Sequence, residues 1–194
     1  MKHSLTLMVF AGMLGLISPG MSASKNPDAA AVLTPKDAIA LVGGPLDEVF
    51  KLESKPASEN GYDHNTICGY FPKGYRLAEA DRPPERGVQL SIHRFKSPKE
   101  AKKFYDLTAE AEREMAKMAE GPSAGAKVTP LKGVGQAGVL SVKKLTPEPK
   151  ANYRVGIASF LKGSVMAQLT VWKRDAAVAP AASSGAKLIA ARLP

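Results

Sequence analysis

The chain has 194 residues, of which 44% are hydrophobic and 23% charged, and its formal net charge is +9. This composition is typical of one globular domain with a real core, and it excludes a largely disordered chain. A single cysteine, Cys68, excludes an intramolecular disulfide, so stability must come from packing. The excess charge is confined to residues 121–194, where 11 basic residues face 2 acidic ones (11 − 2 = +9). Such an asymmetry is typical either of a surface that faces a polyanion or of a merely soluble basic surface.

The N-terminus predicts a secretory signal over residues 1–23, cleaved near Ala23. Lys2 and His3 form a polar start, residues 5–17 are apolar, and small residues follow. The apolar run is shorter than the roughly 20 residues that a membrane-spanning helix needs. We therefore expect a periplasmic or secreted protein with no membrane span after cleavage. An uncleaved membrane anchor is the alternative that stays open.

Residues 24–33 have little pattern and are expected to form a flexible lead-in to a single domain over residues 34–194. The domain opens on a short helix. Thr34 followed by Pro35 and Asp37 is typical of a helix start, and Gly43-Gly44-Pro45 ends the helix after two turns. Strands are expected over residues 47–53, 66–71 and 88–95, and the last of these alternates cleanly between apolar and polar residues.

The strongest local signal lies in residues 97–119, which predict a long helix. Ser97 can cap its first turn, Pro98 suits the first helical position, and Glu100 completes a capping box. One side of this helix is apolar and is expected to face the core, with Ala101, Phe104, Tyr105, Thr108, Met115 and Met118.

The rest of the chain predicts four more strands, over residues 126–131, 137–144, 152–161 and 165–172, and a closing helix over 181–193. We expect a three-residue turn after the third of these strands, which pairs Leu161 with Val165 and sets Arg154 opposite Trp172. Because tight turns cannot join parallel strands, the fold class is α+β. The expected architecture is a mainly antiparallel sheet with the long central helix and the C-terminal helix packed on one face.

Several short motifs are similar to those of a family of small exported bacterial lipoproteins of unknown function. They are the helix that ends in Gly-Gly-Pro, the strand with Cys68-Gly69-Tyr70, and Gly133-Val134-Gly135-Gln136-Ala137 before a hairpin. The chain differs from that family in lacking the lipidated cysteine, and Gln136 stands where an acid is usual. Since the family has no assigned activity, the resemblance implies an architecture only.

Few residues suggest catalysis. His64, Cys68 and His93 are the histidines and the cysteine that remain after removal of the signal, and a Cys-His nucleophile or a metal site needs them within a few ångströms. We expect solvent-exposed histidines and a packed thiol instead. Residues 133–138 lack the following helix of a phosphate-binding loop and predict a turn. No catalytic residue, metal or cofactor is therefore predicted.

The candidate binding site is a basic cluster. If residues 137–144 pair with 152–161, basic side chains and one tryptophan gather at one end of the sheet: Lys143, Lys144, Lys150, Arg154, Trp172, Lys173 and Arg174. An acidic envelope protein or an anionic polymer is the expected partner, and nucleic acid is not, because no nucleic-acid-reading motif is present. A solvated basic rim without a partner is the plain alternative.

These features favour an exported, non-enzymatic protein-interaction module of the cell envelope, for example an inhibitor or an immunity-type binder. A carrier or sensor of a small anionic or apolar ligand is the second hypothesis, and an enzyme of another kind is the third. The oligomeric state and the identity of the partner do not follow from the sequence.

Overall fold

The computed structural model describes residues 27–54, 62–75, 84–118, 127–144, 153–174 and 177–194. The predicted signal lies outside these ranges. The helices are α1 (Ala29–Val32), α2 (Pro35–Val42), α3 (Pro98–Met118) and α4 (Val178–Arg192). The strands are β1 (Asp47–Ser54), β2 (Tyr62–Phe71), β3 (Arg86–Phe95), β4 (Lys127–Pro130), β5 (Ala137–Lys144), β6 (Arg154–Lys162) and β7 (Val165–Lys173). No helix within the described ranges is long and apolar enough to cross a membrane.

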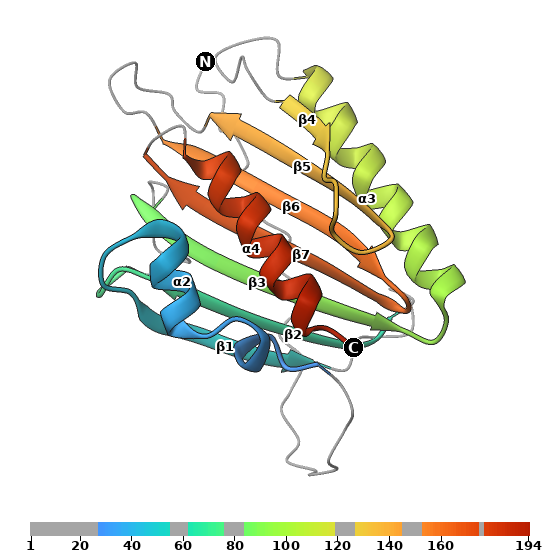
Figure 1. Cartoon of the computed structure of the whole chain (residues 1–194), viewed down its shortest axis with the longest axis horizontal. Coiled ribbons are helices and arrows are strands. Elements are labelled where there is room, and N and C mark those ends of the chain that lie inside the picture. Colours follow the sequence, from blue (N-terminus) through green and yellow to red (C-terminus); the bar gives the residue numbers. More distant parts are fainter. Residues whose placement is uncertain (1–26, 55–61, 76–83, 119–126, 145–152, 175–176) are drawn as a thin grey trace, which may run out of the picture.

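The strands form one seven-stranded sheet in the order β1-β2-β3-β7-β6-β5-β4 (Figure 1). Every neighbouring pair is antiparallel, which confirms the predicted α+β class with an antiparallel sheet. At the centre, β3 pairs with β7, so the N-terminal and C-terminal halves of the chain meet there. After β3 the chain passes through α3 to the far edge strand β4, and it returns strand by strand to the centre.

The predicted starts of α2 and α3 are confirmed in atomic detail, whereas α4 begins at Val178, three residues before the predicted start. Thr34 and Asp37 form a capping box, in which the Asp37 amide donates to Thr34 Oγ1 at 3.3 Å and the Thr34 amide donates to Asp37 Oδ2 at 3.0 Å. At α3 the amide of Glu100 donates to Ser97 Oγ at 3.2 Å. Capping chemistry is local, which is why a short stretch of sequence was enough to locate both helices.

The turn between β6 and β7 differs from the prediction. It has two residues, Gly163 and Ser164, and it pairs Lys162 with Val165 and Leu161 with Met166. Gly163 has a φ of 58°, which suits the first central position of a type II′ turn and is rare for other residues. The one-residue change in register sets Arg154 opposite Lys173 rather than Trp172.

The prediction that both long helices pack on one face is wrong, because this register redistributes the side chains. Phe160 and its cross-strand partner Ala167 belong to the core under α4, which also includes Ile189. The next pair, Leu161 and Met166, belongs to a separate cluster under α3. Since successive residues of a strand point to opposite faces, α3 and α4 cover opposite faces of the sheet.

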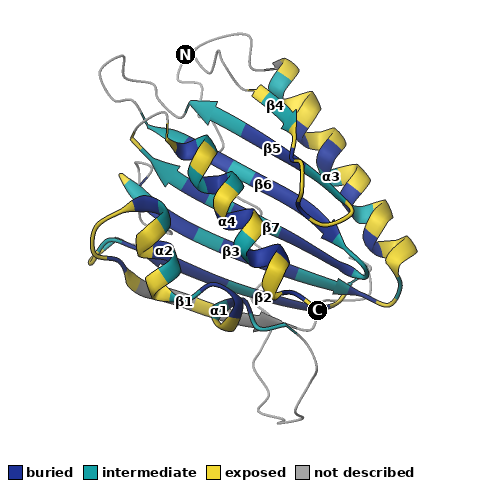
Figure 2. Ribbon diagram, viewed as in Figure 1, coloured by how far each residue is buried: buried dark blue, intermediate teal, exposed yellow. Residues whose placement is uncertain are grey.

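The two faces are covered to different extents. On the α4 face, α4 lies across the central strands and α1 and α2 lie over the β1–β3 side (Figure 1). The central strands are buried over most of their length, whereas the helices expose their outer sides (Figure 2). On the α3 face, α3 contacts β3, β4, β6 and β7.

Met115 of α3 is 45% exposed, so the prediction of a core role for it is wrong, because Tyr105, Ala109 and Glu112 face the sheet instead.

Part of the predicted flexible lead-in, residues 24–33, belongs to the core. Asp28 caps α1 by accepting from the amide of Ala30 at 3.0 Å, and Ala29 and Leu33 are buried. The hydroxyl of Tyr70 donates to the carbonyl of Leu33 at 2.7 Å. The sequence pattern missed this segment because a helix of four residues is too short to show a periodicity.

Candidate binding surface

Four basic residues lie directly opposite one another in four neighbouring strands at one end of the sheet. Lys144 of β5 pairs with Arg154 of β6, Arg154 pairs with Lys173 of β7, and Lys173 pairs with Arg86 of β3. We call these four residues the basic row. Residues paired in this way project to the same face, and Gly156, two residues after Arg154, packs against Ala182 and Val178 of α4. The basic row therefore lies on the α4 face.

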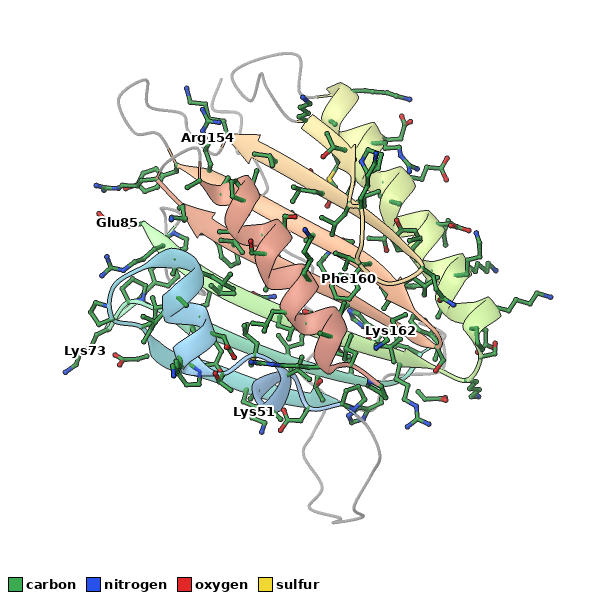
Figure 3. The ribbon with its side chains drawn as sticks, in the orientation of Figure 1. Lys51, Lys73, Glu85, Arg154, Phe160 and Lys162 are labelled. Atoms are coloured by element: carbon green, nitrogen blue, oxygen red, sulfur yellow. The ribbon has the colours of Figure 1, made fainter. Side chains whose placement is uncertain are left out.

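The basic row is electrostatically unfavourable for the isolated fold. Three strand spacings of roughly 4.8 Å give it a length of about 14 Å. Like charges directly opposite each other destabilise a sheet, and here three successive cross-strand positions pair basic residues. Figure 3 shows Arg154 and Glu85 at the same end of the sheet, with Lys162 towards the other end. An anionic partner would relieve the repulsion.

The surroundings of the basic row add positive potential. The N-terminus of α4 begins close to Gly156, and it has no side-chain cap and no acidic residue in its first turn. The guanidinium of Arg86 lies against Gly44, where an added Cβ would come within 2.8 Å of its Cζ atom. Gly44 also has a φ of 74°, which is rare for other residues. The position therefore requires glycine both for its backbone conformation and for the space that the guanidinium occupies. The loop after α2 thus fixes the position of Arg86.

Within the described residues, no ion pair involves Lys144, Arg154 or Arg86. The Nε atoms of both arginines are buried and have no hydrogen-bond acceptor in that part of the chain. Guanidinium groups with unused donors are suited to carboxylates and phosphates, which accept two parallel hydrogen bonds.

The other predicted site residues do not join the basic row. Lys143 faces α3, where its Nζ lies 3.0 Å from Glu112 Oε2, and Trp172 packs against Phe71 on the same face. Arg174 forms an ion pair with Glu85 and donates a hydrogen bond to Tyr153 at 2.9 Å. Lys150 lies outside the described residues. The predicted cluster is thus divided between two faces, because consecutive strand residues point in opposite directions.

Sequence reasoning missed Arg86, because the strand was expected to begin at residue 88 and it begins at Arg86. The alternation of β3 extends back to this residue, since Arg86, Val88, Leu90 and Ile92 project to one face. That signal identifies its face but not its neighbours. The proximity to Lys173 depends on the pairing of β3 with β7, which are about 80 residues apart in the chain.

The histidines differ from their predicted exposure, whereas the thiol agrees with it. Cys68 is buried, as expected, but His64 is only 5% exposed and lies within β2, which begins at Tyr62 rather than at the expected residue 66. His93 packs against the rings of Tyr62 and Phe104, at centroid distances of 4.9 and 5.6 Å, and burial lowers its pKa to about 4. Cys68 and His93 face opposite sides of the sheet. In the described part of the chain, no group of three or more metal-ligating side chains occurs.

The glycine-rich segment before β5 is a turn, as predicted. Gly133 and Gly135 have φ values of 71° and 57°. The amide of Gln136 donates to the carbonyl of Leu161 at 2.8 Å, and the Gly163 amide donates to Gln136 Oε1 at 2.9 Å. Through these two hydrogen bonds the segment stabilises the turn between β6 and β7.

Comparison with known proteins identifies a shared fold. No protein-family model and no curated protein matches the chain. Among solved structures, the extracellular domain of PknH from Mycobacterium tuberculosis superposes with a TM-score of 0.62 at 12% sequence identity. The match covers 85% of this chain and 94% of that one. The two chains share a fold. At this identity the likeness to the PknH domain concerns the arrangement of helices and strands, and it assigns no activity.

Proposed function

We propose that the chain is an exported, non-enzymatic module that binds an acidic segment of a protein partner through the basic row. An inhibitor or an immunity-type binder of the cell envelope is one form that such a module takes. The fold shared with an extracellular domain and the N-terminal sequence pattern both fit export.

The observation that carries this proposal is the repulsion within the basic row. Lys144 and Arg154 lie directly opposite each other and have no ion-pair partner among the described residues, which gains nothing for the fold, whereas a binding surface gains affinity and faster association from such a pair. The spacing suits an extended peptide. Side chains of alternate residues in a strand lie roughly 6.6 Å apart, so three alternate carboxylates span about 13 Å, close to the length of the row.

A direct test uses a synthetic peptide with alternating glutamate and threonine, Glu-Thr-Glu-Thr-Glu-Thr, and the mature chain. We expect saturable binding that weakens with added salt, and weaker binding of the isomer Glu-Glu-Glu-Thr-Thr-Thr, whose charges are bunched. The variant K144E/R154E/K173E should lose binding. The control K127E/K132E/K187E changes the net charge equally at exposed positions and should keep it.

The same variants test the natural partner. Capture from envelope and secreted fractions of the producing organism should recover an acidic protein with the wild type and with the control variant, but not with the row variant. Equal capture by both variants would show that net charge, rather than the basic row, is responsible. Equal peptide binding by the row variant and the wild type would overturn the proposal.

A carrier or sensor of a small ligand is the second candidate function. The observation that favours it is separate from the basic row: a hollow of ≈ 330 Å³ lies between α3 and the edge strands β4 and β5. Ligand sites of small molecules begin at about this size. Ligand-dependent stabilisation of the folded chain would support this function.

A further inference from the structure

The hollow beside β4 is mainly apolar. Its lining includes Val128, Pro130, Leu131, Ala137 and Val139, and Leu131 and Val139 are only 8% and 4% exposed. Tyr105 of α3 contributes one wall. Apolar walls of this kind bind hydrocarbon, because each buried methylene group is favourable.

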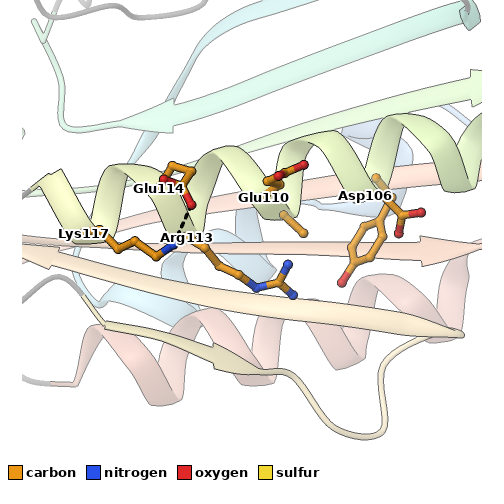
Figure 4. A pocket seen from close by; sticks show the side chains of 7 residues that line it. Asp106, Glu110, Arg113, Glu114 and Lys117 are labelled. Carbon is orange, nitrogen blue, oxygen red and sulfur yellow. Dashed lines mark hydrogen bonds and ion pairs between the residues drawn. The ribbon is translucent and has the colours of Figure 1, made fainter.

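The cationic side chain of Arg113 lies at the edge of this hollow. Arg113 of α3 lines both the apolar hollow and an adjoining surface hollow of ≈ 400 Å³ along the helix. Burial raises the pKa of the Tyr105 phenol, and the positive charge of Arg113 opposes that rise, so the two groups are close. Figure 4 shows the Arg113 side chain extending away from the helix, towards the strands.

The acidic residues around Arg113 are largely engaged elsewhere. Glu114 pairs with Lys117 at 2.7 Å (Figure 4), and Asp106 pairs with Lys102 at 2.6 Å. Glu110 is the third acid that lines the adjoining hollow. Within the described residues, Arg113 has no ion-pair partner. Its guanidinium therefore keeps its donors for a ligand.

We infer that this hollow binds a small amphipathic carboxylate, with its hydrocarbon chain against Val128, Leu131 and Val139 and its carboxylate on Arg113. The apolar walls and the Arg113 guanidinium are complementary to these two parts. A neutral hydrocarbon would leave the guanidinium unused, and a compact polar anion would leave the walls exposed. The site rests on α3 and β4, so it does not depend on the basic row.

The experiment compares octanoate with octanol, two ligands with the same chain length and different head groups, by titration calorimetry. Octanoate should bind the wild-type chain in a 1:1 ratio and more tightly than octanol. Arg113→Gln should weaken octanoate binding by about tenfold and leave octanol binding unchanged. Lys103→Gln, an exposed position on the same helix, is the control and should bind octanoate as the wild type does. Glu110→Gln should strengthen octanoate binding by removing a nearby negative charge.

A second variant tests the apolar part. Val128→Trp fills the hollow and should abolish binding of both ligands, and Ala137→Met serves the same purpose if the first variant does not fold. The inference is overturned if octanoate does not bind the wild type, or if Arg113→Gln or the filled variant binds it as tightly as the wild type does. Loss of peptide binding by the basic-row variant has no bearing on these outcomes.

Discussion

Lys143 and Lys144 are adjacent in the chain, yet they lie in contrasting electrostatic environments. On the α3 face, Lys143 is paired with Glu112, and their side chains are 21% and 7% exposed. On the α4 face, Lys144 stands opposite Arg154, and no acid pairs with it among the described residues. The first charge is satisfied within the fold and the second is not. This difference is the basis for our proposal that one side of the sheet end serves stability and the other side binds a partner.

The largest effect should come from breaking the buried pair. Lys143→Ala leaves the buried carboxylate of Glu112 without its partner and should cost about 3 kcal/mol of the free energy of unfolding. Thermal denaturation should show a loss of roughly 5–10 °C. Lys144→Ala, one residue away, is the matched control and should change the midpoint by less than about 1 °C. An equal decrease in the melting temperature of both variants would show that the two lysines do not differ in their contribution to stability.

The α3 face also holds a partly buried histidine whose titration should be visible. Because burial lowers the pKa of His93 from 6.5 in the unfolded chain to about 4, protonation favours unfolding. The stabilisation is therefore complete above pH 6.5 and is lost as the pH falls towards 4, by about 2 kcal/mol at pH 5.

This effect is measured by urea denaturation of the wild type and of His93→Leu between pH 4 and 8. The stability difference between the two proteins should change with pH only below about 6.5. A difference that is constant throughout would show that His93 is not buried as a neutral side chain.

The smallest effect should be a gain in stability within the basic row. Arg154→Glu replaces two like-charge contacts by two opposite-charge contacts, with Lys144 and Lys173, and should raise the free energy of unfolding by about 0.5 kcal/mol. The same change should weaken binding of the alternating glutamate peptide. A variant that loses stability together with binding would indicate that Arg154 has a structural role.

Local chemistry predicted most of the elements. The caps at Thr34 and Ser97 and the alternation in β3 identified helices and strands to within a few residues. The faces could not be predicted in the same way, because they depend on one residue of turn length at Gly163. That single register set Arg154 opposite Lys173 rather than Trp172.

The candidate site was predictable only in part for a related reason. Lys144, Arg154 and Lys173 lie on strands that follow one another along the chain, so their proximity could be inferred from hairpin geometry. Arg86 and Arg113 could not be placed from the sequence. Their positions depend on the pairing of β3 with β7 and on the side of the sheet to which α3 packs. Such long-range contacts leave little trace in local sequence patterns.

The pairing of β3 with β7 also bears on how the chain folds. The hairpins β2–β3 and β6–β7 close over short distances, whereas Arg86 must find Lys173 across almost half of the chain. Contacts of such high sequence separation slow folding, because the entropy of a long loop is lost before they form. Until they do, both central strands expose an unpaired edge. We therefore expect the β3–β7 pairing to form last. We also expect it to be the point at which β3 of one chain can pair with β7 of another, which would give a domain-swapped dimer.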